Sequence, residues 1–196
     1  MRRDVTVTKI DQKKKNKDMR RTLRVAASAS KSYHLRAMGA GSLSTSRTGS
    51  GHIVTTDVPT TSGGKDSAAE PIYHLLSALV GCKTATCTFV ARKMKLNVRE
   101  LQFELSAERD QQGSLSMPIE QDPKVSAALQ EITGVCYVDA PGVTDEELAM
   151  LARQTHLRCP VACMIVASGT KLDVRFARLM SEEELRPGGN DGSFMV

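Results

Sequence analysis

The chain has 196 residues, of which 40% are hydrophobic and 25% charged, a composition typical of a soluble globular protein. No run approaches the roughly 18 uncharged apolar residues of a membrane span, so we expect no membrane partner. The absence of Trp and an aromatic fraction of only 4% argue against a protein that stacks nucleic-acid bases.

The positive charge of the chain is a property of its N-terminal segment. Residues 1–21 hold nine Lys or Arg and three Asp, which leaves 18 basic and 19 acidic residues in the remainder. We therefore expect a solvated basic tail over 1–31, a single domain over 32–177 and a polar C-terminal tail over 178–196. A role of the basic tail in binding nucleic acid is the less favoured interpretation.

The N-terminal residues also bear on the compartment. They lack the apolar core of a secretory signal, so we expect a cytoplasmic protein. Residues 19–56 contain no acidic residue and are rich in Ser, Thr and Arg, which makes mitochondrial import the alternative. In either reducing compartment the five cysteines are expected to pack or to do chemistry rather than to form stable disulfides.

The first half of the domain predicts strands followed by a long helix. Residues 33–59 alternate short apolar stretches with Gly and Ser, as a strand meander does, and 61–71 form a polar loop. Pro71 suits the first turn of a helix that we predict over 72–91. Lys83 is its only formal charge, so this helix is expected to be buried on most of its surface.

The second half predicts strands around a second helix. Alternation predicts strands over 101–107, 132–138 and 171–176, and 109–127 form a long loop with one short helical piece. Thr144 and Glu147 have capping-box spacing and open a helix that Pro160 stops. The fold class is α+β, with mostly antiparallel pairing and helices on one face of a sheet. Because one sheet face cannot cover the long helix, we expect a homodimer.

Cys82, within the first helix, and Cys159, at the end of the second, are the candidate functional residues. Each is either a small buried residue or half of a redox pair, in which one thiolate attacks a peroxide and the second thiol condenses with the sulfenic acid. Cys82 lies eleven residues beyond Pro71, roughly 16 Å along the axis, and would need a nearby Arg to ionise. Cys159 lies at the negative end of its helix, where only Arg158 or His156 offsets the dipole, and is the better resolving thiol.

The other histidines and cysteines that were considered as functional residues are expected to have structural roles. His156 compensates the helix dipole, His74 lies among apolar residues as a buried imidazole, and Cys136 belongs to a strand core. His156, Cys159 and Cys163 with Cys82 and Cys87 could be drawn as a zinc site, but their spacings do not match structural zinc knuckles. We therefore predict no metal and no cofactor.

Two stretches, GHIVTTDVPTTSGGKDSAAEPIYHLLSALVGC and TDEELAMLARQTHLRCPV, resemble the OsmC-like proteins, relatives of the organic hydroperoxide resistance proteins. The resemblance covers roughly residues 32–177 and implies an intertwined dimer of α+β subunits with buried central helices. It also implies that Cys82 is the peroxidatic and Cys159 the resolving cysteine of a thiol-dependent peroxidase. Organic hydroperoxides would be the substrates and a dithiol such as a lipoyl group the reductant.

The chain departs from the family pattern at two positions. The family carries a Glu just after the helix-opening Pro, where this chain has Ile72 and Tyr73. The family Arg of the strand meander is also missing, with Arg36 and Arg47 as the nearest substitutes. The alternative function is therefore an OsmC-fold dimer with little peroxidase activity that binds a small apolar ligand or senses redox state.

Overall fold

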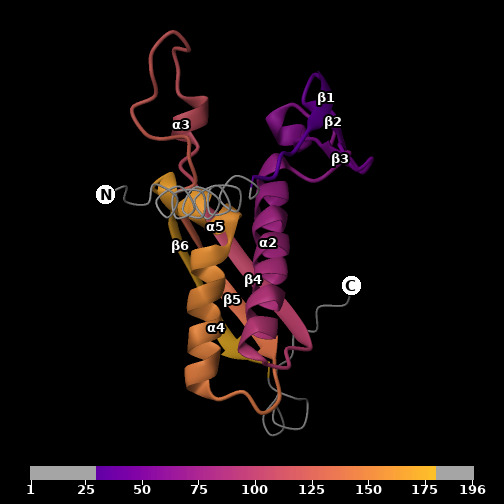
Figure 1. Cartoon of the computed structure of the whole chain (residues 1–196). Helices are drawn as coiled ribbons and strands as arrows, with labels where there is room; N and C mark the ends of the chain where they lie inside the picture. Colours follow the sequence, from indigo (N-terminus) through magenta and orange to yellow (C-terminus); the bar gives the residue numbers. More distant parts are fainter. Residues whose placement is uncertain (1–29, 180–196) are drawn as a thin grey trace, which may run out of the picture. The chain divides into compact units, whose positions relative to one another are not determined.

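The structure, a computed structural model, describes residues 30–179 (Figure 1). These residues form two compact units that meet in sequence between Ala69 and Glu70, and each unit is described by itself. The predicted tails over 1–31 and 178–196 lie almost wholly outside the described residues. The predicted domain boundaries therefore stay predictions.

The first unit is the predicted strand meander. Strands β1 (Leu35–Ala40), β2 (Leu43–Thr48) and β3 (Ile53–Thr56) pair antiparallel in the order β1-β2-β3. Arg36 and Arg47 are direct partners in the β1 and β2 register. A 3-10 turn, η1 (Thr60–Ser62), follows, and the first unit ends in the polar loop predicted from the sequence.

Asp57 organises that loop from within. Its side chain is 1% exposed, and its carboxylate accepts hydrogen bonds from the Ser42 and Ser67 hydroxyls and from the backbone N–H groups of Val58, Lys65 and Ser67. These hydrogen bonds, led by those from the two hydroxyls, hold the pKa of the carboxyl far below its usual range. The Asp of the Asp-x-Pro motif therefore has a structural role as the anchor of the loop.

The second unit is built on a three-stranded sheet. Strand β5 (Glu131–Asp139) lies in the centre, antiparallel to β4 (Glu100–Glu108) and parallel to β6 (Lys171–Arg178). The loop between β4 and β5 contains the short helix α3 (Gln112–Leu115), as predicted. The fold is the expected α+β class with antiparallel pairing in the majority, since only β5 and β6 run parallel.

Helix α2 (Pro71–Met94) is the long apolar helix predicted from the sequence. Pro71 occupies its first turn, and Glu70 stands at the N-cap without a side-chain hydrogen bond. Within the single chain α2 buries one face and leaves Tyr73 and Phe89 exposed. The prediction that this helix is buried on most of its surface is therefore wrong for the single chain. The buried positions follow helical spacing and are Leu79, Lys83, Cys87, Val90 and Ala91.

Among the described helices, α2 alone is long and apolar enough to cross a membrane by length and composition. This is weak evidence, because the central helix of a globular domain passes the same test. Helix α2 packs against α4, α5 and β4, and its only charge before the last turn, Lys83, is buried.

The second half of the unit contains one helix more than the sequence predicted. Helix α4 (Asp145–Arg158) begins with the expected capping box, in which Thr144 Oγ1 accepts from the Glu147 N–H and the Glu147 carboxylate from the Thr144 N–H. Pro160 ends α4 but also starts a further helix, α5 (Pro160–Ala167). The prediction was incomplete because proline, which cannot continue one helix, fits the first turn of the next.

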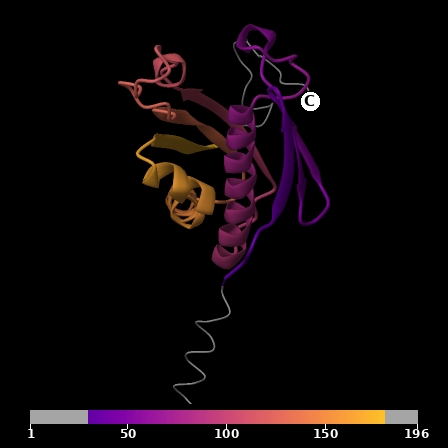
Figure 2. The same cartoon turned by 90° about the horizontal axis from the view of Figure 1, so that it is seen from above.

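Helices α2, α4 and α5 cover the same face of the sheet (Figures 1 and 2). The strand register places Phe103, Cys136 and Phe176 in one row across this face. Gly134 is required on the same face, because a Cβ there would meet the Glu104 carbonyl oxygen at 2.1 Å. The helices thus enclose a core between themselves and the sheet, with Cys159 inside it and Cys82 at its edge.

Candidate active site

The structure brings together Cys82 and Cys159, the two cysteines singled out from the sequence. Cys82 lies midway along α2, and Cys159 lies at the junction of α4 and α5. Cys82 packs against the core cluster that contains Cys159, and the two thiols interact electrostatically. Cys159 is fully buried and Cys82 half-buried, so Cys82 is the thiol of the pair that a substrate reaches more easily.

The position of Cys159 differs from the prediction in one respect. The residue caps the C-terminus of α4, as expected, but it is also the N-cap of α5, and its sulfur accepts a hydrogen bond from the Ala162 N–H at 3.5 Å. The expectation that the Cys159 thiolate faces only a negative helix end was wrong, because α5 points its N-terminus at the same sulfur.

Burial nevertheless dominates the chemistry of Cys159. Desolvation raises the pKa of its thiol, the Ala162 N–H lowers it, and the neighbouring Cys82 thiol raises it. The Ala162 hydrogen bond and the Lys83 charge do not cancel this rise. Cys159 is therefore protonated at neutral pH, which is the state expected of a thiol that waits for a sulfenic acid.

An apolar pocket of about 360 Å³ opens beside Cys82. Phe89 and Ala85 of α2 and Pro160 of α5 form its apolar wall. Arg158, the last residue of α4, is the only charged side chain that lines it. The pocket therefore offers one thiol, one guanidinium and an apolar surface within reach of one small molecule.

Arg158 reaches the pocket from the last turn of α4. Its Nε donates to Gln154 Oε1 at 3.0 Å, one turn earlier in the same helix, and this bond restrains the side chain. From the sequence, Arg158 is expected only to offset the helix dipole near Cys159. The cation of Cys82 is expected in the strand meander, at Arg36 or Arg47, and these two residues lie in the first unit.

Lys83 is a second cation near the thiols that sequence reasoning did not assign. It is 1% exposed, and its ammonium lies 6.0 Å from the centre of the Phe176 ring. Burial lowers the pKa of Lys83, and the charges of Cys159, Cys136, Cys87 and Cys82 raise it, in that order. In the sequence Lys83 stands out as the lone charge of an apolar helix. A single sequence does not show whether its side chain lies in the core or in solvent.

The remaining cysteines have different environments. Cys87 and Cys136 are fully buried, and desolvation raises the pKa of both thiols, that of Cys136 to about 12. They are core residues, as predicted for Cys136. Cys163 is exposed and donates to the Leu157 carbonyl at 3.5 Å. Only Cys82 and Cys159 combine mutual contact with a neighbouring pocket.

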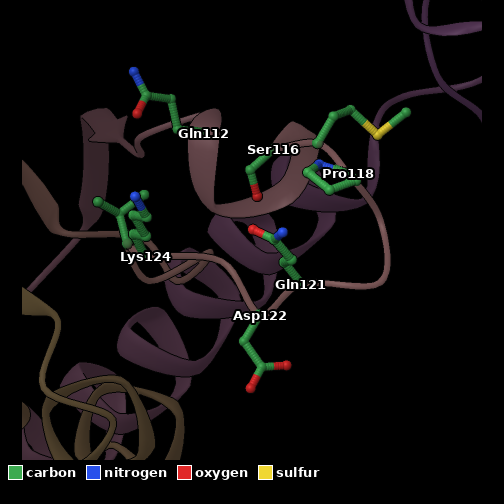
Figure 3. Close-up of a pocket in the computed structure, with 8 residues that line it drawn as sticks. Gln112, Ser116, Pro118, Gln121, Asp122 and Lys124 are labelled. Atoms are coloured by element: carbon green, nitrogen blue, oxygen red, sulfur yellow. The ribbon is translucent and has the colours of Figure 1, made fainter.

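A second hollow, of about 210 Å³, lies in the loop between β4 and β5 (Figure 3). Gln112, Ser116, Gln121 and Lys124 line it, and the Asp122 side chain points away from the other labelled residues. All its residues come from one segment of chain, and it holds no thiol or histidine. It is a hollow within a loop and offers no chemistry comparable to that of the cysteine pair.

The zinc arrangement considered from the sequence does not form in the described part of the chain. Within residues 30–179, no group of three or more His, Cys, Asp or Glu side chains could hold a metal ion. His156 lies in the last turn of α4, as predicted, where burial and then the Lys83 charge lower its pKa. This favours a neutral imidazole over the dipole-compensating cation that the sequence suggested.

Comparison with known proteins identifies the architecture. The sequence profile of the family described as OsmC-like protein matches residues 64–175. The chain belongs to the OsmC-like protein family. The match covers more than half of the chain and includes α2, both thiols and all of the second unit's sheet except the end of β6. A search of curated proteins gives no match.

Solved structures of OsmC-like proteins share the fold at low identity. An OsmC-like protein from Mycoplasma pneumoniae is 20% identical, with a TM-score of 0.62, over 76% of this chain and 99% of that one. The organic hydroperoxide resistance protein OsmC from Legionella pneumophila is 16% identical, with a TM-score of 0.57, over 76% and 98%. For OhrB of Bacillus subtilis, also an organic hydroperoxide resistance protein, the values are 12%, 0.51, 75% and 98%.

Proposed function

We propose that this OsmC-like protein is a thiol-dependent peroxidase that reduces organic hydroperoxides, with Cys82 as the attacking and Cys159 as the resolving cysteine. The observation that carries the proposal is the contact between these two thiols at the edge of an apolar pocket. The family links of the structural neighbours to organic hydroperoxide resistance support the choice of reaction.

The reaction has two steps on the protein. The Cys82 thiolate attacks the terminal oxygen of the hydroperoxide, so that an S–O bond forms and the O–O bond breaks. The terminal hydroxyl stays on the sulfur as a sulfenic acid, and the alkoxide leaves as an alcohol with the proton that the Cys82 thiol gave up on ionising. Cys159 then attacks the Cys82 sulfenic acid. A disulfide forms, the S–O bond breaks, and the hydroxide takes the thiol proton to give water. A dithiol reductant, which we expect to be of lipoyl type, then reduces this disulfide and regenerates both thiols.

Arg158 takes the place of the missing family cation in this proposal. It is the charged group of the pocket that Cys82 lines, so its guanidinium is placed to donate to the alkoxide that develops from the substrate. This role does not need the Glu that Ile72 and Tyr73 replace. The apolar wall at Ala85 and Phe89 favours an organic hydroperoxide over hydrogen peroxide.

We also propose that the protein acts as a homodimer, in the cytoplasm or, as the alternative, in the mitochondrion. On the single chain, helix α2 and the β4–β5 loop leave large apolar side chains exposed. This exposure favours a second subunit that buries them. The exposed apolar residues of these segments include Tyr73, Leu75, Phe89, Leu115, Met117 and Ile119.

Steady-state turnover tests the proposed function. The full chain is mixed with dihydrolipoamide as reductant and with either cumene hydroperoxide or hydrogen peroxide, and peroxide loss is followed. We expect catalytic loss of cumene hydroperoxide at a kcat/KM at least about tenfold above that for hydrogen peroxide, because only the organic substrate fills the apolar wall. Equal rates for the two peroxides would show that the apolar pocket does not bind the substrate. Absence of turnover would contradict the proposed peroxidase reaction.

The alternative is a dimer that senses redox state with little turnover. The raised pKa of the buried Cys159 thiol favours this alternative. A resolving thiol that reacts slowly lengthens the lifetime of the sulfenic acid on Cys82. In that case the first equivalent of cumene hydroperoxide reacts, and dihydrolipoamide restores the thiols too slowly for catalysis. The turnover experiment separates this outcome from the peroxidase.

A further inference from the structure

Lys83 is a buried cation without a carboxylate partner. Its side chain is 1% exposed, and within residues 30–179 no carboxylate lies within ion-pair distance of it. A buried ammonium without a counter-charge costs free energy, and Met or Leu would fill the same space without that cost. The position therefore calls for an explanation other than packing.

The groups around Lys83 supply that explanation. They come from four elements packed around its side chain, and those that titrate are thiols and one imidazole. The aromatic ring of Phe176 on β6 lies 6.0 Å from the ammonium. The titratable neighbours are Cys82 and Cys87 on α2, Cys136 on β5, His156 on α4 and Cys159 at the α4–α5 junction.

Lys83 follows Cys82 directly on α2, and Cys82 packs against the core cluster that contains Cys159, so the buried Lys83 side chain and the Cys159 thiol belong to one core. Of the thiols that act on the Lys83 charge, Cys159 is the first. The same thiol touches Cys82 and must become a nucleophile when Cys82 is oxidised. His156 is not a substitute cation, since burial and Lys83 itself keep the imidazole neutral. Within residues 30–179, the ammonium of Lys83 is therefore the positive charge that acts on Cys159 from inside the core.

We propose that Lys83 is a positioning residue whose charge stabilises the thiolate of Cys159 and so sets the rate at which the sulfenic acid of Cys82 is resolved. The inference rests on the proposed function where it concerns the oxidation of Cys82. The effect of the Lys83 charge on the Cys159 thiolate does not depend on that function. During resolution the Cys159–Cys82 disulfide forms, the S–O bond of Cys82 breaks, and the hydroxide leaves with the Cys159 proton as water. Lys83 stabilises the negative charge that Cys159 carries as its proton leaves.

The electrostatic part is tested without peroxide. In a Cys82→Ser background, proteins with Lys83 and with Lys83→Met are labelled with 13Cβ cysteine, and the Cys159 resonance is followed as pH rises. We expect the Cys159 midpoint to be higher by about one pH unit, a tenfold change, in the Lys83→Met protein. An unchanged midpoint overturns the proposal, whether or not the chain is a peroxidase.

The kinetic part uses the full chain with all its cysteines. After one equivalent of cumene hydroperoxide, dimedone trapping and mass spectrometry follow the sulfenic acid at Cys82 over time. In Lys83→Met we expect the sulfenic acid to form at the normal rate and to persist about tenfold longer at neutral pH, with a loss that recovers as pH rises. Lys83→Arg, which keeps the charge, should restore part of the rate.

Two further measurements separate this role from a structural one. Lys124→Met removes an exposed lysine from the β4–β5 loop and should change neither the titration nor the lifetime. The melting temperature of Lys83→Met should equal or exceed that of the parent, because an apolar side chain replaces a buried charge. A lower melting temperature with parallel loss of both kinetic steps would mean that Lys83 only supports the fold, and would overturn the proposal.

Discussion

Replacing Cys82 by Ser is expected to reduce kcat/KM for cumene hydroperoxide by at least roughly a thousand-fold, to the rate of the remaining thiols. The serine hydroxyl has nearly the shape of the thiol but is not ionised at neutral pH, so it cannot attack the peroxide oxygen. Stopped-flow or coupled peroxide assays with excess dihydrolipoamide measure the loss. The melting temperature should change little, because Cys82 is only half-buried at the edge of the core.

Two matched variants make this result specific. Cys163→Ser removes the exposed thiol of α5, which lies outside the pocket, and should keep the parental rate. Cys159→Ser should consume the first equivalent of hydroperoxide normally and then stop, with a sulfenic acid on Cys82 that dimedone traps. If Cys163→Ser loses activity and Cys82→Ser keeps it, the assignment of the attacking thiol is wrong.

Removal of the guanidinium from the pocket has the second largest expected effect. In Arg158→Met we expect kcat/KM for cumene hydroperoxide to fall on the order of a hundredfold, because one charged donor to the developing alkoxide is lost. The same change should slow the formation of the sulfenic acid at Cys82, because that is the step in which the alkoxide leaves.

A control on the same helix isolates that charge. Arg153 is exposed on α4 and does not line the pocket, so Arg153→Met should leave both kcat/KM and the rate of sulfenic acid formation unchanged. Arg158→Lys keeps the charge without the forked donors and should recover part of the rate. If Arg158→Met reacts as fast as the parent, the family cation has no substitute at this position.

The elements that sequence patterns predicted well are those with a strong local signal. Pro71 before an apolar stretch marks the start of α2, and the capping box at Thr144 and Glu147 marks the start of α4. Alternation places β4, β5 and β6 within about two residues of their ends. These features depend on neighbours along the chain, which a single sequence contains.

The features that were missed depend on residues distant in the chain. Pro160 stops α4 and starts α5, and only the packing of α5 on α2 and β6 shows the second role. Lys83 was recognised as a lone charge, but its burial among thiols follows from the rotation of α2 against the sheet. Arg158 enters the pocket of Cys82 from another helix, so a search for the cation near the family motif did not find it.

The measurement that tests the account most directly is a disulfide map after a single oxidation. The reduced full chain receives one equivalent of cumene hydroperoxide, is alkylated under denaturing conditions and is digested for mass spectrometry. We expect one major product, in which Cys82 and Cys159 are joined while Cys87, Cys136 and Cys163 carry the alkyl label. A chain whose Cys82 and Cys159 both remain reduced, or whose disulfide joins other cysteines, would contradict the proposed peroxidase.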